Sequence, residues 1–323
     1  MQVNCSVVIP TYKRPFLLKK CLDALLQQQT NISFEVIVTS DGQDEETNDL
    51  MNQFFSLNSH FRFGFLEKKS GPAAARNKGW KEAHGELILF TDDDTQPLPD
   101  WIDNFWKAYL VNNKKDIAFT GSVKVPVSKK PTDYEKNTAG LETAEFVTAN
   151  CACTQSVLQQ INGFDENFGM AWREDSELQF KLMKENIPIV KVGDAVVMHP
   201  VRKAAWGVSL KEQKKSMFNA LLYKKHPRLF RTNISASPVW NYYRIIVLFL
   251  LAVFFFFFKK PFPAFAFTCI WLLLVSRFTI KRLRGSSHSF SHVSEMIVTS
   301  LLIPFLSVYW TLYGAVKFKV FFL

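Results

Sequence analysis

Three long apolar segments in the last third of this 323-residue chain constrain its fold more than any other feature. They cover residues 240–258, 262–280 and 296–316, and Arg277 interrupts the second of them. A helix needs about 20 apolar residues to cross a bilayer, where its backbone must satisfy its own hydrogen bonds. We therefore expect a membrane domain at residues 236–323 with two to three hydrophobic helices. Buried helices of a soluble protein are the alternative, but three in succession without a polar face argue against it.

Basic residues flank these segments and set the orientation that we expect. The formal net charge is +10, and much of the excess lies at Lys224, Lys225, Arg228, Arg231, Lys281, Arg282 and Arg284. Cytoplasmic loops of membrane proteins are enriched in Lys and Arg. This favours an inner membrane with the preceding domain facing the cytoplasm, and Lys259 and Lys260 violate the rule unless the first two segments form a shallow hairpin. No nucleic-acid-binding motif is visible, so nucleic acid is not an expected partner.

Residues 1–235 alternate short apolar runs with amphipathic helical patterns, as a soluble domain does. The runs predict strands at 5–9, 34–39, 61–66 and 86–91, with helices between them. Such alternation with short connections predicts an α/β domain with a mainly parallel central sheet covered on both faces. Beyond residue 116 the less regular pattern predicts a surface excursion at residues 126–143, and further elements: strands at 117–125, 146–154 and 189–198, and helices at 174–186 and 209–225.

Polar clusters follow three of these strands where each one ends. They are Pro10-Thr11-Tyr12, Asp41-Gly42 and Asp92-Asp93-Asp94. Ligands of parallel sheets bind beyond the carboxyl ends of the strands, so the three clusters are expected to meet. Adjacent carboxylates repel one another unless they are solvated or bind a cation. The triplet is therefore either a solvated acidic loop or a site for Mg²⁺ or Mn²⁺.

Three further features are candidates for chemistry. Glu174-Asp175 begins a predicted helix, where acidic residues either stabilise the helix dipole or act as a general base. Small residues at 71–75 precede a helix, and we expect Arg76 to pair with a phosphate or with Asp41, although a plain helix start is an equal alternative. His199 ends a strand and is either structural or a metal ligand.

Five motifs, taken in their order, resemble glycosyltransferase family 2 over about residues 3–200. They are VVIPTYKRP (7–15), EVIVTSDG (35–42), GPAAARNKG (71–79), LFTDDDTQPLPDW (89–101) and NGFDENFGMAWREDSEL (162–178). The resemblance implies the Rossmann-like GT-A fold. It also implies an inverting enzyme that uses Mg²⁺ or Mn²⁺ to move a sugar from a nucleotide-diphosphate sugar, expected to be a UDP-sugar, to an acceptor hydroxyl.

The resemblance also assigns roles to individual residues. Asp175 is the expected base with Glu174 beside it, and Asp94 and His199 face the metal. The expected donor-binding residues are Pro10, Thr11, Tyr12, Arg14, Asp41, Arg76, Asp92 and Asp93.

Two departures from the family pattern refine the expectation. The usual pair of acids after the second strand is here Ser40-Asp41, so one acid is lost. The Gln-x-x-Arg-Trp motif of processive members is absent, which favours transfer of one sugar at a time. A site beside a membrane suggests an acceptor glycan or lipid-linked sugar. The alternatives are a nucleotidyltransferase, which would release pyrophosphate, and a non-catalytic membrane scaffold with the same fold.

Overall fold

The computed structural model describes residues 3–322, except for the side chains of Phe55 and Leu57. The chain divides into two compact units. Unit 1 comprises Met1–Pro126 and Ala139–Val201, and unit 2 comprises Val127–Thr138 and Arg202–Leu323.

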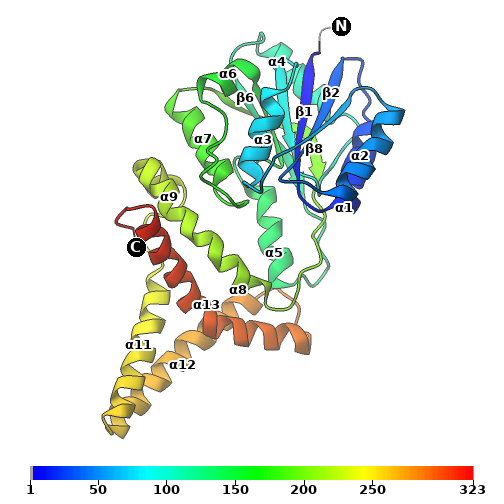
Figure 1. Cartoon of the computed structure of the whole chain (residues 1–323). Coiled ribbons are helices and arrows are strands. Elements are labelled where there is room, and N and C mark those ends of the chain that lie inside the picture. The colour runs from blue at the N-terminus through cyan, green and yellow to red at the C-terminus, as the bar shows by residue number, and fades with distance from the viewer. Residues whose placement is uncertain (1–2, 323) are drawn as a thin grey trace. The chain divides into compact units, whose positions relative to one another are not determined.

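Unit 1 is built on an eight-stranded sheet in the order β3-β2-β1-β4-β7-β6-β8-β5 (Figure 1). The strands that pair in parallel at one side are β1 (Cys5–Thr11), β2 (Phe34–Ser40), β3 (Phe61–Phe65) and β4 (Leu87–Thr91). The remaining strands are β5 (Gln96–Pro97), β6 (Ala118–Lys124), β7 (Asn150–Thr154) and β8 (Ile189–Met198). β7 runs antiparallel to both β4 and β6, while β6 and β8 pair in parallel. The sheet is therefore mixed, and its first four strands confirm the predicted parallel arrangement.

Helices cover both faces of this sheet, as predicted. One face packs against α1 (Pro15–Leu26), α2 (Glu45–Leu57) and α4 (Trp101–Val111), and the other against α3 (Pro72–Lys81), α6 (Gln155–Gln160) and α7 (Glu174–Lys184). All seven residues of β1 are buried, because strands covered on both faces have no solvent side. α4 and α6 are additional to the predicted elements, and a short 3₁₀ helix, Gly140–Thr143, follows α5.

Unit 2 begins earlier in the chain than the expected boundary between residues 235 and 236. Its short helices are α5 (Asp133–Ala139), α8 (Val208–Glu212), α9 (Met217–Lys225) and α10 (Pro227–Asn233). Its long helices are α11 (Trp240–Phe257), α12 (Pro261–Leu283) and α13 (Phe290–Lys317). α8 and α9 pack against α13, which explains why they belong to this unit. The predicted helix at 209–225 is interrupted by a 3₁₀ turn at Gln213–Ser216.

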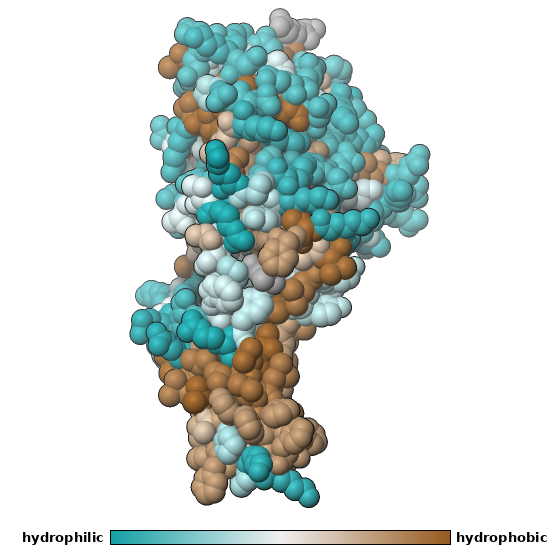
Figure 2. Space-filling model, turned by 90° about the vertical axis from the view of Figure 1, so that its left-hand side faces the viewer, coloured by the Kyte–Doolittle hydropathy of each residue, from teal (hydrophilic) through white to brown (hydrophobic). Residues whose placement is uncertain are grey.

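The three long helices are each long and apolar enough to cross a membrane. Apolar side chains gather over α11 and α12 in Figure 2, toward the lower end of the view, with a few hydrophilic side chains at the very end. Phe257, Phe262 and Phe265 on these helices are each at least 74% exposed. An apolar surface of this extent marks a membrane or protein contact.

Candidate active site

The clusters after β1 and β4 meet at one edge of the sheet in unit 1, as predicted from the strand directions. The Thr11 hydroxyl donates a hydrogen bond to Asp93 Oδ2 at 2.8 Å, and Arg14 Nη1 lies 3.1 Å from Asp93 Oδ1. Burial removes water from Asp93 and raises the pKa of its carboxyl to about 6, although the Arg14 guanidinium opposes this shift. Asp93 therefore joins the end of β1 to the acidic triplet.

The cluster after β2 lies against the loop that precedes α3. Asp41 Oδ1 accepts hydrogen bonds from the backbone N–H groups of Ser70 at 2.6 Å and Gly71 at 2.9 Å. A Cβ added at Gly42 would lie 3.6 Å from Tyr12 Cε2, so the Tyr12 ring lies beside the Asp41-Gly42 turn. Two predicted donor-binding residues, Tyr12 and Asp41, are therefore neighbours, while Pro10 is buried within β1.

Arg76 has different partners from those expected. Its side chain is 2% exposed, with Nη2 2.6 Å from Asp92 Oδ1 and Nη1 3.3 Å from Glu174 Oε1. The proposed pairing with Asp41 is wrong, because α3 carries Arg76 toward the end of β4 while Asp41 is bonded to backbone at Ser70 and Gly71. Since both terminal nitrogens of Arg76 contact carboxylates, we assign it to positioning Asp92 and Glu174 rather than to binding phosphate.

Replacing Arg76 with methionine is expected to lower the free energy of unfolding by about 3–5 kcal/mol, because the buried Glu174 would lose its counter-ion and Asp92 would lose its ion pair. Arg76→Lys should lose less, since it keeps the charge but contacts one carboxylate at a time. Urea unfolding of the two variants measures the difference. Lys81→Met, an exposed change at the end of the same helix, is the control. Equal stability of Arg76→Met and wild type would contradict this account of the ion pair.

Glu174 and Asp175 begin α7 within the same cluster. Burial raises the pKa of both carboxyls, and the charge of Asp175 raises that of Glu174 further. Arg173, just before them, has a left-handed backbone with φ of 73° and lies 4.8 Å over the Trp172 ring. Glu174 is held by Arg76, while Asp175 is half-buried at the N-terminal end of the helix. A carboxylate with a raised pKa at a partly open position suits a general base.

Asp92, Asp94 and His199 form a group suited to a divalent cation. One ligand atom from each lies within 4.8 Å of the others, and His199 Nε2 is 3.6 Å from Asp94 Oδ1. His199 Nδ1 is buried and has no hydrogen-bond partner among the described residues, which is unfavourable for a buried nitrogen. Two carboxylates with one imidazole are acceptable ligands for Mn²⁺ and, less readily, for Mg²⁺. The structure thus brings together both predicted metal ligands and adds Asp92 to them.

Asn77 contributes to this site although no role was predicted for it from the sequence. It is 4% exposed, and its amide nitrogen donates to the Phe164 carbonyl at 2.9 Å and to Glu166 Oε1 at 2.8 Å. Its amide oxygen accepts from Phe164 N and Trp80 Nε1, both at 2.9 Å. Asn77 therefore holds the loop 163–166, which leads toward α7, against α3. The sequence feature that could have indicated this role is the position of Asn77 beside Arg76 in the motif at residues 71–79.

Asn77→Ala is expected to reduce the free energy of unfolding by about 2–3 kcal/mol, because the Phe164 amide and carbonyl would lose their partners while buried. Asn77→Asp should destabilise at least as much, since it still accepts both hydrogen bonds but turns a buried carboxylate oxygen toward the Phe164 carbonyl and the Glu166 carboxylate. Thermal and urea unfolding test this, with Asn52→Ala on the exposed side of α2 as the control. If Asn77→Ala lowered the free energy of unfolding no more than the control does, Asn77 would not hold the loop 163–166 against α3.

The chain is similar in sequence to several known proteins. The chain is 29% identical over 153 residues to hyaluronan synthase of Pasteurella multocida, covering 46% of this chain and 15% of that protein. It is 24% identical over 271 residues to chondroitin synthase of Escherichia coli, covering 70% and 39%. Validoxylamine A glucosyltransferase of Streptomyces hygroscopicus subsp. jinggangensis is 24% identical over 270 residues, covering 69% and 61%. The chain thus spans less than two thirds of each relative's length.

The fold has counterparts among solved structures. The structure of S. aureus TarS 1–349 matches with a TM-score of 0.50 and 16% identity, covering 93% of this chain and 91% of that one. At this identity the match supports the GT-A fold alone. The family model described as glycosyl transferase family 2 matches residues 6–170, which is about half of the chain and runs from β1 through the loop that Asn77 holds. On this match the chain belongs to glycosyltransferase family 2.

Proposed function

We propose that the protein is an inverting, metal-dependent glycosyltransferase that transfers one hexose or hexose derivative at a time from a UDP-sugar to an acceptor hydroxyl. The observation that carries this proposal is the grouping of Asp92, Asp94 and His199 beside the Glu174-Asp175 pair, with Arg76 bridging Asp92 and Glu174. A cation site and a carboxylate base side by side are what displacement of a diphosphate by a hydroxyl requires.

Each residue of the group has a distinct task in this mechanism. Asp175 accepts the proton of the acceptor hydroxyl. The hydroxyl oxygen attacks the anomeric carbon from the side opposite the diphosphate, whose bond to that carbon breaks, and this inverts the configuration. Arg76 holds the Glu174 and Asp92 carboxylates in place and opposes the rise in the pKa of Glu174 that burial and Asp175 cause. A Mg²⁺ or Mn²⁺ ion held by Asp92, Asp94 and His199 would supply positive charge opposite the departing diphosphate.

The choice of UDP as the donor nucleotide is supported by family membership and by one structural relative. S. aureus TarS 1–349, which shares the fold, has been solved in complex with UDP. In this chain Tyr12 and the buried Asp41 are neighbours at the ends of β1 and β2, where a base and ribose would lie. Arg14 and Thr11, also proposed to bind the donor, both contact Asp93 at the same strand end.

The acceptor is proposed to be a lipid-linked sugar or an envelope glycan at the cytoplasmic face of the inner membrane. Helices long enough to cross a bilayer support a membrane location. The relatives named hyaluronan synthase and chondroitin synthase build glycans, which supports a sugar acceptor. The basic residues before α11 and at the end of α12 favour the cytoplasmic side.

A donor screen tests the proposal. The purified full chain is mixed with individual nucleotide sugars, with and without Mn²⁺, and both thermal stabilisation and released product are measured. Stabilisation by a UDP-sugar only with Mn²⁺, and release of UDP in the presence of acceptor, are the expected results. Release of pyrophosphate would indicate a nucleotidyltransferase instead, and binding of no nucleotide sugar would indicate a scaffold.

A further inference from the structure

α13 does not stand alone within unit 2, because residues 207–225 run along it. At one end the Gly207 N–H donates a hydrogen bond to Glu295 Oε1 at 2.7 Å. Toward the other end the helices touch closely: a Cβ added at Gly314 would lie 2.4 Å from the Met217 carbonyl oxygen. Figure 1 shows the C-terminal half of α13 beside α9. Any depth that α13 has in a membrane is therefore shared by residues 207–225.

The accompanying segment is too basic for the interior of a bilayer. It carries Lys211, Lys214, Lys215, Lys224 and Lys225 within nineteen residues. Lys214 Nζ lies 5.6 Å from the centre of the Trp310 ring, and Lys224 Nζ donates to the Phe318 carbonyl at 2.8 Å. Trp310 stands about 22 Å along the helix from Glu295, at a rise of 1.5 Å per residue. In a helix that crosses with Glu295 at one boundary, Trp310 would lie about 8 Å inside the other boundary of a hydrocarbon core about 30 Å thick, where a lysine is disfavoured.

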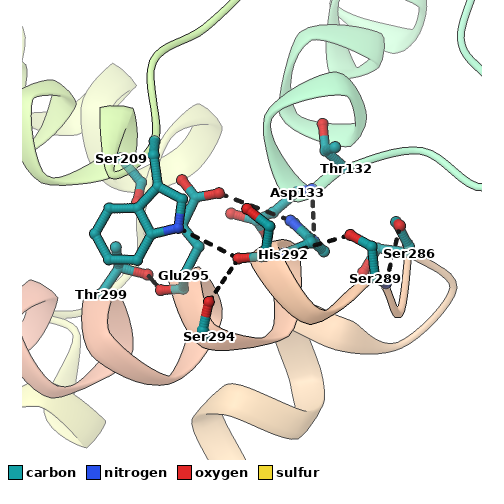
Figure 3. Close-up of polar contacts among 12 residues, drawn as sticks. Thr132, Asp133, Ser209, Ser286, Ser289, His292, Ser294, Glu295 and Thr299 are labelled. Carbon is teal, nitrogen blue, oxygen red and sulfur yellow. Dashed lines mark hydrogen bonds and ion pairs between the residues drawn. The ribbon is translucent and has the colours of Figure 1, made fainter.

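The first turns of α13 are held in a polar cluster, and Figure 3 draws the part of it around His292. His292 Nε2 accepts a hydrogen bond from the Asp133 N–H at 3.3 Å. Arg282 is 9% exposed. Its Nη2 lies 2.8 Å from Asp133 Oδ2, and its Nη1 donates to Thr299 Oγ1 at 2.6 Å. Ser209 of α8 completes the cluster by accepting from Arg282 Nη2 at 3.3 Å. The N-terminal third of α13 is thus anchored to charged residues of α5 and α12.

The two sides of α13 differ in the way expected of a helix lying in a membrane surface. The side of α13 that faces the rest of unit 2 is buried and includes His292, Met296, Thr299, Ile303 and Gly314. The outer side is apolar and exposed, and includes Ile297, Leu302, Tyr309, Leu312, Tyr313 and Val316. A helix with one apolar outer side and basic neighbours binds at the boundary between headgroups and acyl chains.

α11 and α12, by contrast, bury few of their residues within unit 2. α11 buries Ile245 and Ala252, and α12 buries four residues. At 18 and 23 residues, they are about 27 and 35 Å long, close to the thickness of about 30 Å of the hydrocarbon core. They pack against each other, and the turn between them carries Lys259 and Lys260.

We infer that α11 and α12 form the inserted hairpin, while α13 lies along the membrane surface with residues 207–225 and presents their lysines to anionic lipid headgroups. This inference rests on the membrane location proposed above. It places the end of α13 on the same side of the bilayer as residues 207–225, and the turn between α11 and α12 on the other side.

Cysteine labelling tests this topology in the full-length protein. Lys225→Cys, Lys259→Cys and Lys317→Cys are each made in a Cys269→Ser background, because the other four cysteines are buried. Sealed vesicles of both orientations are treated with a membrane-impermeant maleimide. Lys317→Cys should label in the same vesicles as Lys225→Cys, and Lys259→Cys in those of opposite orientation.

Two outcomes would contradict the inference. Labelling of Lys317→Cys together with Lys259→Cys would show that α13 crosses and would overturn the inference. Release of the whole protein by alkaline carbonate would instead remove the membrane location itself, and the inference with it, while leaving the sugar transfer untouched. An alkaline phosphatase or green fluorescent protein fused after the last residue gives a second reading, since only the latter should be active if α13 stays on the cytoplasmic side.

Discussion

Replacing Asp175 with asparagine is expected to reduce sugar transfer by about 10²- to 10⁴-fold, the usual contribution of a general base. Donor affinity should stay close to that of wild type. Asparagine keeps the shape of the side chain and its hydrogen bond from the Ser176 N–H, which is 2.6 Å in the structure. It cannot accept a proton, so only the chemical step should suffer.

Single-turnover kinetics and donor titrations separate these two effects. Glu185→Gln removes a negative charge from the exposed end of the same helix and serves as the matched control. Full transfer by Asp175→Asn would mean that another group removes the proton. A large loss of donor affinity would instead indicate that Asp175 contacts the nucleotide sugar.

The same base predicts a pH dependence. Asp175 must be deprotonated to act, and burial raises its pKa above the ordinary value of an aspartate. Activity should therefore fall as the pH drops through this raised pKa, at a higher pH than an exposed carboxyl would give. Glu174 is buried beside it and titrates with it, so the acidic limb belongs to the pair. The residual activity of Asp175→Asn should show a weaker limb.

Asp94→Asn is expected to lower turnover by about 10²- to 10³-fold, comparable to removing a main electrostatic stabiliser of a transition state. The substitution exchanges a buried anionic oxygen for a neutral amide within the group of Asp92, Asp94 and His199. Excess chelator should abolish the activity of the wild type, and Mn²⁺ or Mg²⁺ should restore it.

Manganese binding provides a measurement that does not depend on activity. Titration of Mn²⁺ followed by electron paramagnetic resonance should show weaker binding to Asp94→Asn than to wild type. Asp100→Asn, an exposed change in the loop after the triplet, should leave binding intact. Undiminished turnover in excess chelator, or equal Mn²⁺ affinity in Asp94→Asn and wild type, would argue against a cation at this position.

The sequence was sufficient to place most of the site because strand direction determines where strand ends meet. The buried runs of β1, β2 and β4 were visible as continuous apolar stretches, and their parallel pairing brought Thr11 and the acidic triplet together. His199 followed from the same reasoning, since it directly follows β8 at Met198-His199.

The partners of Arg76 could not be predicted in this way. A guanidinium can reach several carboxylates, and the choice depends on the rotation of α3 against the sheet. That rotation is fixed by close packing: a Cβ added at Gly79 would lie 2.5 Å from Val8 Cγ1. No local pattern in the sequence indicates which face of α3 lies against β1, so Asp41 was the only carboxylate predicted as a partner.

Residues 126–143 were expected to form a surface excursion, but residues 127–138 within them belong to unit 2. The reason is the ion pair of Asp133 with Arg282, which lie 149 positions apart. A charged residue in a polar stretch looks solvated from sequence alone, and only the fold of α12 and α13 supplies its buried partner.

The chain passes between the two units at three places, after residues 126, 138 and 201. A shortened protein that ends at residue 201 would therefore keep an orphaned piece of the removed part. Residues 127–138 would lose Arg282 and His292, and Asp133 would be left without either contact. Obtaining the sugar-transferring part in soluble form should require bridging residues 126 and 139 with a short linker as well as the truncation, rather than a single cut.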